Sequence, residues 1–333
     1  MQKITSVNYI TPVEIDLQGN SSKKVILCCY GGLLVLINFN CSRAQRDMKK
    51  YCKNSDLGIL PHNFCYFNPE SLYVNPKSVT TFESVEDSKL SNACIIVNDG
   101  ILDIFSTDRG NIIFQMDLSN RFVEEGDHHH KKSLSSKEKG NPSCVHWCKH
   151  SQDLFVGYTS GEVEMFSPKN KNLETSRPIK SFQAYDTHGA KITAIVSSYV
   201  NATKNVIIVG DVSGKISSWV VASSKDINKV YETNSHSSEI IDFNILSTES
   251  VGLKMLGSSA SSFTLISCSK NTEIRVWLVY SDGSLSLISL KALYESRAEI
   301  LSMSSVIFRL EESSELIDGI FIFGFFYLYN VIY

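Results

Sequence analysis

The sequence predicts an all-β fold assembled from a repeated strand–turn–strand unit. Short runs rich in Val, Ile, Phe and Tyr recur along the 333 residues, separated by Gly, Asn, Asp and Ser. No long segment carries an apolar stripe of 3.6-residue period, which argues against long amphipathic helices. One short pattern also recurs six times, which indicates a repeat architecture. We therefore expect residues 1–333 to form a single repeat-built domain.

The composition is that of an ordinary globular protein, with 43% apolar and 20% charged residues. The net charge of −3 lacks the broad basic footprint that nucleic-acid binding requires. The first residues, MQKITSVNYI, lack the apolar stretch of a signal peptide. The nine cysteines are odd in number and irregularly spaced, so reduced thiols in the cytoplasm or nucleus are the simplest interpretation.

The recurring pattern is a turn residue followed by alternating apolar residues and a large closing residue. A glycine near its start suits a tight turn with positive φ. An apolar run precedes each copy, so each copy is expected to be two strands joined by a turn. The copies are GGLLVLI (31–37), DGILDIF (99–105), SGEVEMF (160–166), SGKISSW (213–219), NTEIRVW (271–277) and FGFFYLY (323–329).

A second pattern, which places apolar residues at its fifth and eighth positions, precedes several copies. It is HGAKITAI from residue 188, HSSEIIDF from 236, SRAEILSM from 296 and GNPSCVHW from 140. We expect it to form the first strand of each repeat.

The stretch CVHWCKH (144–150) falls in that frame, although its two cysteines and two histidines suggest a metal site. Alternate side chains share one face of a strand. Cys144, His146, Cys148 and His150 would then spread over about 20 Å, at about 3.3 Å per residue. Zinc ligands lie about 2.0–2.3 Å from the metal, so the four cannot enclose one ion. The stretch is therefore predicted to be architectural.

These patterns resemble the WD-repeat family. His188 and His236 match its His near the first strand, and Asp99 and Asn271 match its turn Asp. Trp219 and Trp277 match its closing Trp, but the Asp that should follow is replaced by Val220 and Leu278. The repeats are thus degenerate. The resemblance implies a β-propeller of four-stranded antiparallel blades, in which neighbouring sheets hide one another's faces.

Six copies favour six blades, and a seventh remains open in residues 39–92, where NFCYF and SLYVN are strand-like. Only four residues follow the last copy, too few for a further outer strand, so the N-terminal run ITSVNYI is expected to supply the outer strand of the last blade. The apolar run 320–333 is too short for a spanning helix of about 20 residues and is read as strand rather than membrane anchor.

Two polar insertions are predicted to be loops. Residues 120–143 form a mobile loop that includes His128–His130, which could bind a transition metal or simply be solvated. Residues 250–262 form a Ser/Gly-rich loop.

The resemblance implies a non-enzymatic scaffold that binds other proteins on its rim loops. The fourth residue of the first-strand pattern differs between copies, which makes Ser143, Lys191, Glu239 and Glu299 candidate protein-binding positions. Drift at exposed positions explains the variation equally well. No recognised catalytic, metal or cofactor motif is present, so no cofactor is expected. A propeller enzyme, a ligand-binding module and an RNA-associated subunit remain alternatives.

Overall fold

The computed structural model describes the strands and turns of much of the chain. The described residues are 4–9, 24–30, 33–39, 63–67, 78–82, 93–98, 100–106, 112–118, 140–148, 151–167, 178–186, 190–201, 204–222, 226–246, 261–292, 300–309, 316–324 and 328–332. Side chains are described for 100–104, 114–118, 140–148, 151–167, 178–186, 190–200, 204–222, 226–246 and 263–288.

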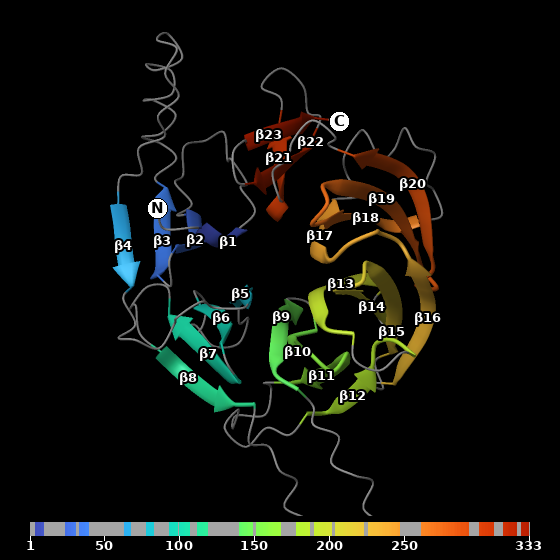
Figure 1. Cartoon of the computed structure of the whole chain (residues 1–333), viewed down its shortest axis with the longest axis horizontal. Coiled ribbons are helices and arrows are strands. Elements are labelled where there is room, and N and C mark those ends of the chain that lie inside the picture. The colour runs from blue at the N-terminus through green and yellow to red at the C-terminus, as the bar shows by residue number, and fades with distance from the viewer. Residues whose placement is uncertain are drawn as a thin grey trace, which may run out of the picture. The chain divides into compact units, whose positions relative to one another are not determined.

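These residues form six antiparallel sheets in which strands consecutive in the sequence pair with one another (Figure 1). The first sheet contains β1 (Ile4–Tyr9), β2 (Lys24–Tyr30), β3 (Leu33–Phe39) and β4 (Asn63–Phe67). The second contains β5 (Ser78–Phe82), β6 (Ala93–Asn98), β7 (Ile101–Ser106) and β8 (Ile112–Asp117). The third contains β9 (Pro142–Cys148), β10 (Asp153–Tyr158), β11 (Glu162–Phe166) and β12 (Lys180–Gln183).

The remaining sheets continue the pattern. The fourth contains β13 (Ile192–Asn201), β14 (Lys204–Asp211), β15 (Lys215–Ala222) and β16 (Ile227–Asn234). The fifth contains β17 (Ile240–Leu246), β18 (Ser261–Ser269), β19 (Glu273–Tyr280) and β20 (Leu285–Ala292). The sixth contains β21 (Ile300–Arg309), β22 (Leu316–Gly324) and β23 (Leu328–Ile332). The prediction of an all-β fold with four-stranded antiparallel sheets is confirmed.

The chain divides into two compact units. One contains Met1–Pro76, Asn244–Val279 and Ser286–Tyr333, and the other contains Lys77–Phe243 and Tyr280–Leu285. The second to fourth sheets lie in the second unit, which holds most of the described side chains. The expectation that 1–333 is one domain stays a prediction.

The recurring unit is confirmed as the second and third strands of each sheet. Its turns lie between β6 and β7, β10 and β11, and β14 and β15, where Gly100, Gly161 and Gly214 have φ of 89°, 83° and 86°. Thr272 occupies the same place between β18 and β19 with φ of 68°, a conformation that costs a β-branched residue energy. The turn geometry therefore imposes a positive φ at this position even where the residue is not glycine.

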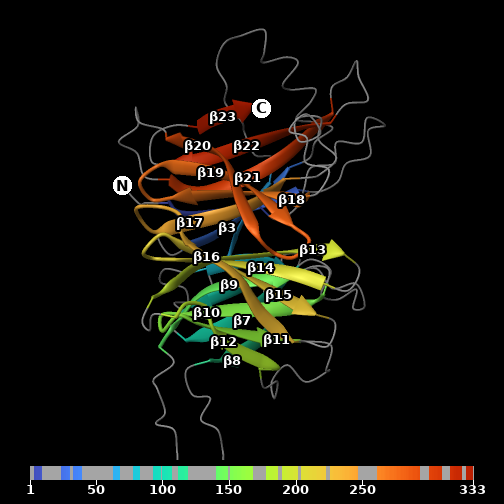
Figure 2. The same ribbon diagram turned by 90° about the vertical axis from the view of Figure 1, so that its right-hand side faces the viewer.

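The first-strand pattern is also confirmed, since β9, β13, β17 and β21 arise from it. Along β9, alternate residues face two different cores. Val145 and Trp147 pack with Leu102 and other residues of the second sheet. Cys144 and Cys148 pack with Ile192 and other residues of the fourth sheet. The third sheet is thus covered on both faces, and the side view shows its strands beside those of the fourth (Figure 2).

Two predicted details are wrong, and part of the segment left open as a seventh blade is described. The N-terminal run forms β1, which pairs with β2 in its own sheet rather than with β23. NFCYF forms β4, the fourth strand of the first sheet; SLYVN lies outside the described residues, and the number of blades stays a prediction. The loop 120–143 is too long, because Pro142 and Ser143 belong to β9 and are buried.

The other predicted segment boundaries differ less from those of the structure. The Ser/Gly loop 250–262 loses Ser261 and Ser262 to the start of β18. Residues 120–139, which include His128–His130, and residues 250–260 lie outside the described residues. The apolar tail contributes to β22 and β23, in agreement with the strand prediction.

Candidate functional site

The turns after β10 and β14 meet the linking segments that lead into the next sheets, at one edge of the third and fourth sheets. A methyl group added to Gly161 would lie 2.9 Å from the carbonyl oxygen of Ala190, and one added to Gly214 would lie 2.3 Å from that of His236. The Gly161 carbonyl accepts the Ala184 amide, and the Gly214 carbonyl accepts the amide of His236. Each glycine therefore provides both the turn and the room for the neighbouring segment.

Four turns share one hydrogen bond, from the fourth turn residue back to the carbonyl of the first. The donors are Gly161, Gly214, Thr272 and Gly283, and the acceptors are Tyr158, Asp211, Ser269 and Tyr280. Because the donor residue has positive φ in each, these are type I turns followed by a left-handed residue, a common hairpin connection. The shared geometry makes their positions comparable from repeat to repeat.

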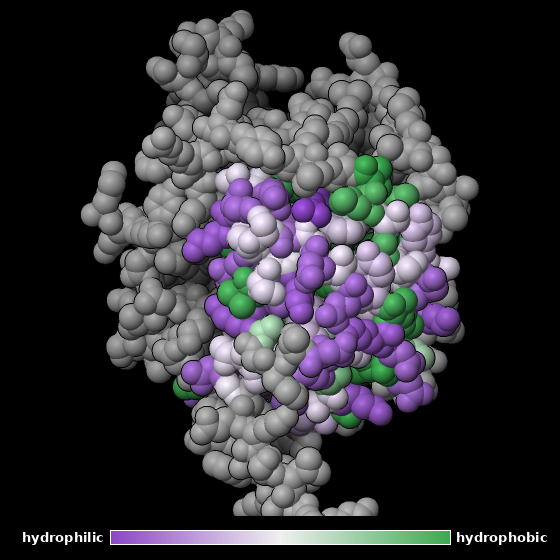
Figure 3. Space-filling view, turned by 45° about the vertical axis from the view of Figure 1, so that its right-hand side comes forward, coloured by the Kyte–Doolittle hydropathy of each residue, from purple (hydrophilic) through white to green (hydrophobic). Residues whose placement is uncertain are grey.

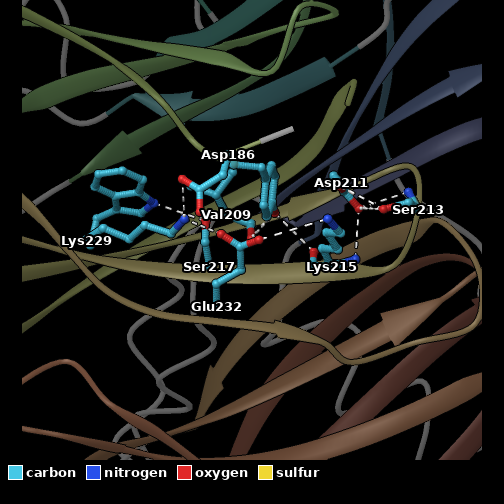
Figure 4. A network of polar contacts seen from close by, with 10 residues as sticks. Asp186, Val209, Asp211, Ser213, Lys215, Ser217, Lys229 and Glu232 are labelled. Atoms are coloured by element: carbon cyan, nitrogen blue, oxygen red, sulfur yellow. Dashed lines mark hydrogen bonds and ion pairs between the residues drawn. The ribbon is translucent and has the colours of Figure 1, made fainter. Parts of the chain in front are cut away.

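The turn after β14 is fixed most firmly. The buried Asp211 carboxylate accepts hydrogen bonds from the Ser213 amide at 2.9 Å, the Ser213 hydroxyl and the Lys215 amide at 2.8 Å (Figure 4). Tyr185 donates its hydroxyl to the carbonyls of Val209 and Lys215 on the two strands. The turn is thus held from inside by a carboxylate and a phenol.

A chain of charges crosses the outer part of the fourth sheet. The Lys229 ammonium contacts Glu232 and lies 3.2 Å from Asp186, whose side chain is 91% exposed (Figure 4). It also lies 5.9 Å from the centre of the Trp219 ring, against which Phe182 packs. Burial lowers the pKa of Lys229, but the hydrogen bonds that its ammonium donates to the Glu232 and Asp186 carboxylates outweigh this effect and leave the pKa raised. This cluster ties β12 and β16 together through Trp219.

The four predicted protein-binding residues differ in their surroundings. Lys191 and Glu239 lie on linking segments of consecutive repeats, and their charged groups are 3.9 Å apart with side chains 46% and 25% exposed. Ser143 is 5% exposed and donates its hydroxyl to the carbonyls of Gly157 and Ile192, so the expectation that it is an exposed rim position is wrong. Glu299 lies outside the described residues.

The predicted structural residues are partly described. Trp219 and Trp277 are buried and donate their indole N–H to Ser217 and Ser267, at 3.0 and 2.9 Å. His236 is buried. Asn271 lies in the turn after β18 and accepts the Ser269 hydroxyl. His188 and Asp99 lie outside the described residues. Sequence reasoning missed the two serines, because the spacing between serine and tryptophan differs between the two repeats.

The CVHWCKH stretch is a strand as far as Cys148, and His150 lies outside the described residues. His146 lies 2.8 Å from the Ser197 hydroxyl of β13, and burial lowers its pKa to about 4. Burial raises the pKa of Cys144 to about 12. Within the described residues no three His, Cys, Asp or Glu side chains are grouped to hold a metal ion. The stretch packs between sheets, in agreement with its architectural interpretation.

Comparison with known proteins finds that no family model and no curated protein matches this chain. Over the residues that the structure describes, no helix has the length and apolar character to cross a membrane.

Proposed function

We propose that the protein is a non-enzymatic scaffold of the WD-repeat class, a six-bladed propeller that binds other proteins on the edge where turns and linking segments meet. The observation that carries the proposal is the meeting of the Gly161 and Gly214 turns with the next linking segments. Backbone hydrogen bonds fix this edge, while the side chains on it differ from repeat to repeat. A rigid frame with variable loops suits specific protein recognition.

The fold by itself does not set the function. What favours binding over chemistry is the kind of side chain at the edge. Lys191 and Glu239 form a partly exposed pair with an N···O distance of 3.9 Å, and such a pair contributes at most about 1 kcal/mol to folding. These charges can therefore pair with a partner at little cost to stability.

A charge-swap experiment tests the proposal. The full chain is used as bait in affinity purification from its native cells, as wild type, Lys191→Glu, Glu239→Lys and the double variant. Each single reversal places like charges together, and the double variant restores the pair in reversed order. We expect the wild type to recover a defined set of proteins, and the double variant to lose members of that set while melting like the wild type.

Two outcomes count against it. A double variant that recovers the full set means that the pair serves only the fold. A wild-type bait that recovers nothing above an unrelated bait means that the scaffold function itself is wrong. Melting curves for all four proteins separate lost binding from lost folding.

A further inference from the structure

The turn after β14 carries an apolar side chain where equivalent turns carry polar ones. Val212 follows Asp211 as the second residue of the turn and is 43% exposed. The corresponding residues of the three other turns are Thr159, Lys270 and Ser281. Turn positions favour polar residues, and Val212 is the apolar one among these four. Neither the turn nor the core accounts for Val212.

The exposed valine is held rigidly. Its amide donates to the Lys191 carbonyl at 3.0 Å, and the next residue, Ser213, is fixed by the Asp211 carboxylate (Figure 4). Because the backbone that carries the side chain is already fixed, little backbone entropy is lost when a partner covers Val212. Burial of an apolar group in water then contributes in proportion to the area covered.

The surroundings of Val212 are charged and hydroxylated. The backbone bond to Lys191 places that residue beside the turn, and Lys191 reaches Glu239 on the next linking segment. The lysine side chain is 46% exposed and the glutamate 25%, so the charge offered to solvent is mainly positive. We call Lys191, Val212, Ser213 and Glu239 the Val212 tip. Figure 3 shows hydrophobic residues standing in small separate groups among hydrophilic ones on one face of the described molecule.

We propose that the Val212 tip is the docking point for an acidic–apolar segment of a partner protein. The partner's large apolar side chain covers Val212, and its neighbouring Asp or Glu pairs with Lys191. Charge complementarity selects this occupant over a basic segment, because the lysine is the more exposed member of the ion pair. Polar contacts around a central apolar contact exclude water from it and so strengthen it. The inference rests on the proposed scaffold function and names the partner chemistry of its edge.

The probe is a random dodecapeptide display library selected against the immobilised full chain. Selected peptides are synthesised and titrated calorimetrically against the wild type, Val212→Ser, Lys191→Glu and Val230→Ser. Val230 on β16 is a matched control, because it is also an exposed valine of the same unit, at 39%, but lies away from the turn. Unfolding curves confirm that all variants fold.

We expect the peptides to share an acidic residue beside a large apolar one. Val212→Ser and Lys191→Glu should each weaken their binding about tenfold or more, and Val230→Ser should leave it unchanged. Peptides that bind all four proteins equally would overturn the inference while leaving the scaffold function standing. Enrichment of basic peptides would overturn the inference, because such peptides would pair with Glu239 instead of Lys191.

Two further outcomes also count against the inference. If no peptide is enriched although native partners are recovered by the full chain, the tip does not bind short segments. If sedimentation shows the wild type self-associating and Val212→Ser monomeric, the occupant is a second copy of this chain.

Discussion

Replacing Gly214 by Ala tests the turn geometry on which the edge depends. Gly214 has φ of 86°, and a left-handed conformation costs an L-residue about 1–2 kcal/mol. The added methyl would also lie 2.3 Å from the His236 carbonyl oxygen and 2.7 Å from that of Ser238. Both are backbone atoms, so relief requires movement of the linking segment, which we place at about 1–3 kcal/mol. The total expected loss is about 2–5 kcal/mol.

Gly283→Ala provides the matched control. Gly283 has φ of 89°, nearly that of Gly214, but the atom nearest to its added methyl is a side-chain methyl of Val220 at 2.7 Å. A side chain can move more easily than backbone, so this variant should lose mainly the conformational term of about 1–2 kcal/mol. The difference between the two variants isolates the clash with the linking segment.

Urea unfolding followed by tryptophan fluorescence measures both variants. All three tryptophans of the chain, Trp147, Trp219 and Trp277, are buried, so unfolding exposes each indole to water. Midpoint and slope are compared with those of the wild type, because a changed slope would signal a changed denatured state. An ordinary surface substitution changes the free energy of unfolding by less than about 0.5 kcal/mol. If Gly214→Ala loses no more than that, or no more than Gly283→Ala loses, the close approach of the linking segment to Gly214 is wrong.

Four further predictions follow from single residues. Burial lowers the pKa of His146 to about 4, whereas the unfolded state has a value of about 6.5. Between these two pH values only the unfolded state binds the proton, so the free energy of unfolding should fall as pH drops, by up to about 3 kcal/mol. His146→Phe should flatten that part of the curve of stability against pH. Ser143→Ala should lower the free energy of unfolding by about 1–2 kcal/mol, as measured by chemical denaturation. Ser160→Ala should lower it by almost nothing, because the Ser160 hydroxyl oxygen has no hydrogen-bond partner among the described atoms. Burial keeps the pKa of Cys144 at about 12, so iodoacetamide at pH 8 should label it only after unfolding; labelling of the native protein, located by mass spectrometry, would contradict this. Thr272→Gly should leave thermal stability unchanged or raise it by up to about 1 kcal/mol, since it relieves a positive φ, and a clear loss would show that Thr272 is not strained.

The strand and turn units could be predicted because their causes are local. A glycine with positive φ is dictated by the few residues of a turn, and Gly161 and Gly214 carry that signal in the sequence itself. Alternation of apolar residues likewise marks a strand wherever it pairs. The same local rules predicted the strand through Cys148 correctly, since alternation along β9 sends Cys144 and Trp147 to different cores.

The partner of a strand or side chain could not be predicted in the same way. The strand character of ITSVNYI is local, but the sequence did not show whether this strand pairs with the next strand or with the last one, and it pairs with the next one, β2. Ser143 shows the same limit for a side chain. A serine after a polar loop reads as exposed, yet the carbonyl of Ile192, distant in sequence, draws its hydroxyl into the interior. No pattern around Ser143 contains that information.

The Lys191–Glu239 pair changes the interpretation of the variable positions. The sequence left two explanations for their differing residues, drift and partner recognition. Equivalent positions of consecutive repeats lie close enough to pair, with 3.9 Å between the Lys191 ammonium and the Glu239 carboxylate. Opposite charges there relieve the repulsion that a repeated lysine would create, so each position constrains its neighbour. Yet a pair this exposed stabilises the fold by at most about 1 kcal/mol, which leaves both charges free to exchange one partner for another. The swap of both charges is therefore decisive, because it preserves the constraint between repeats and changes only what a partner meets.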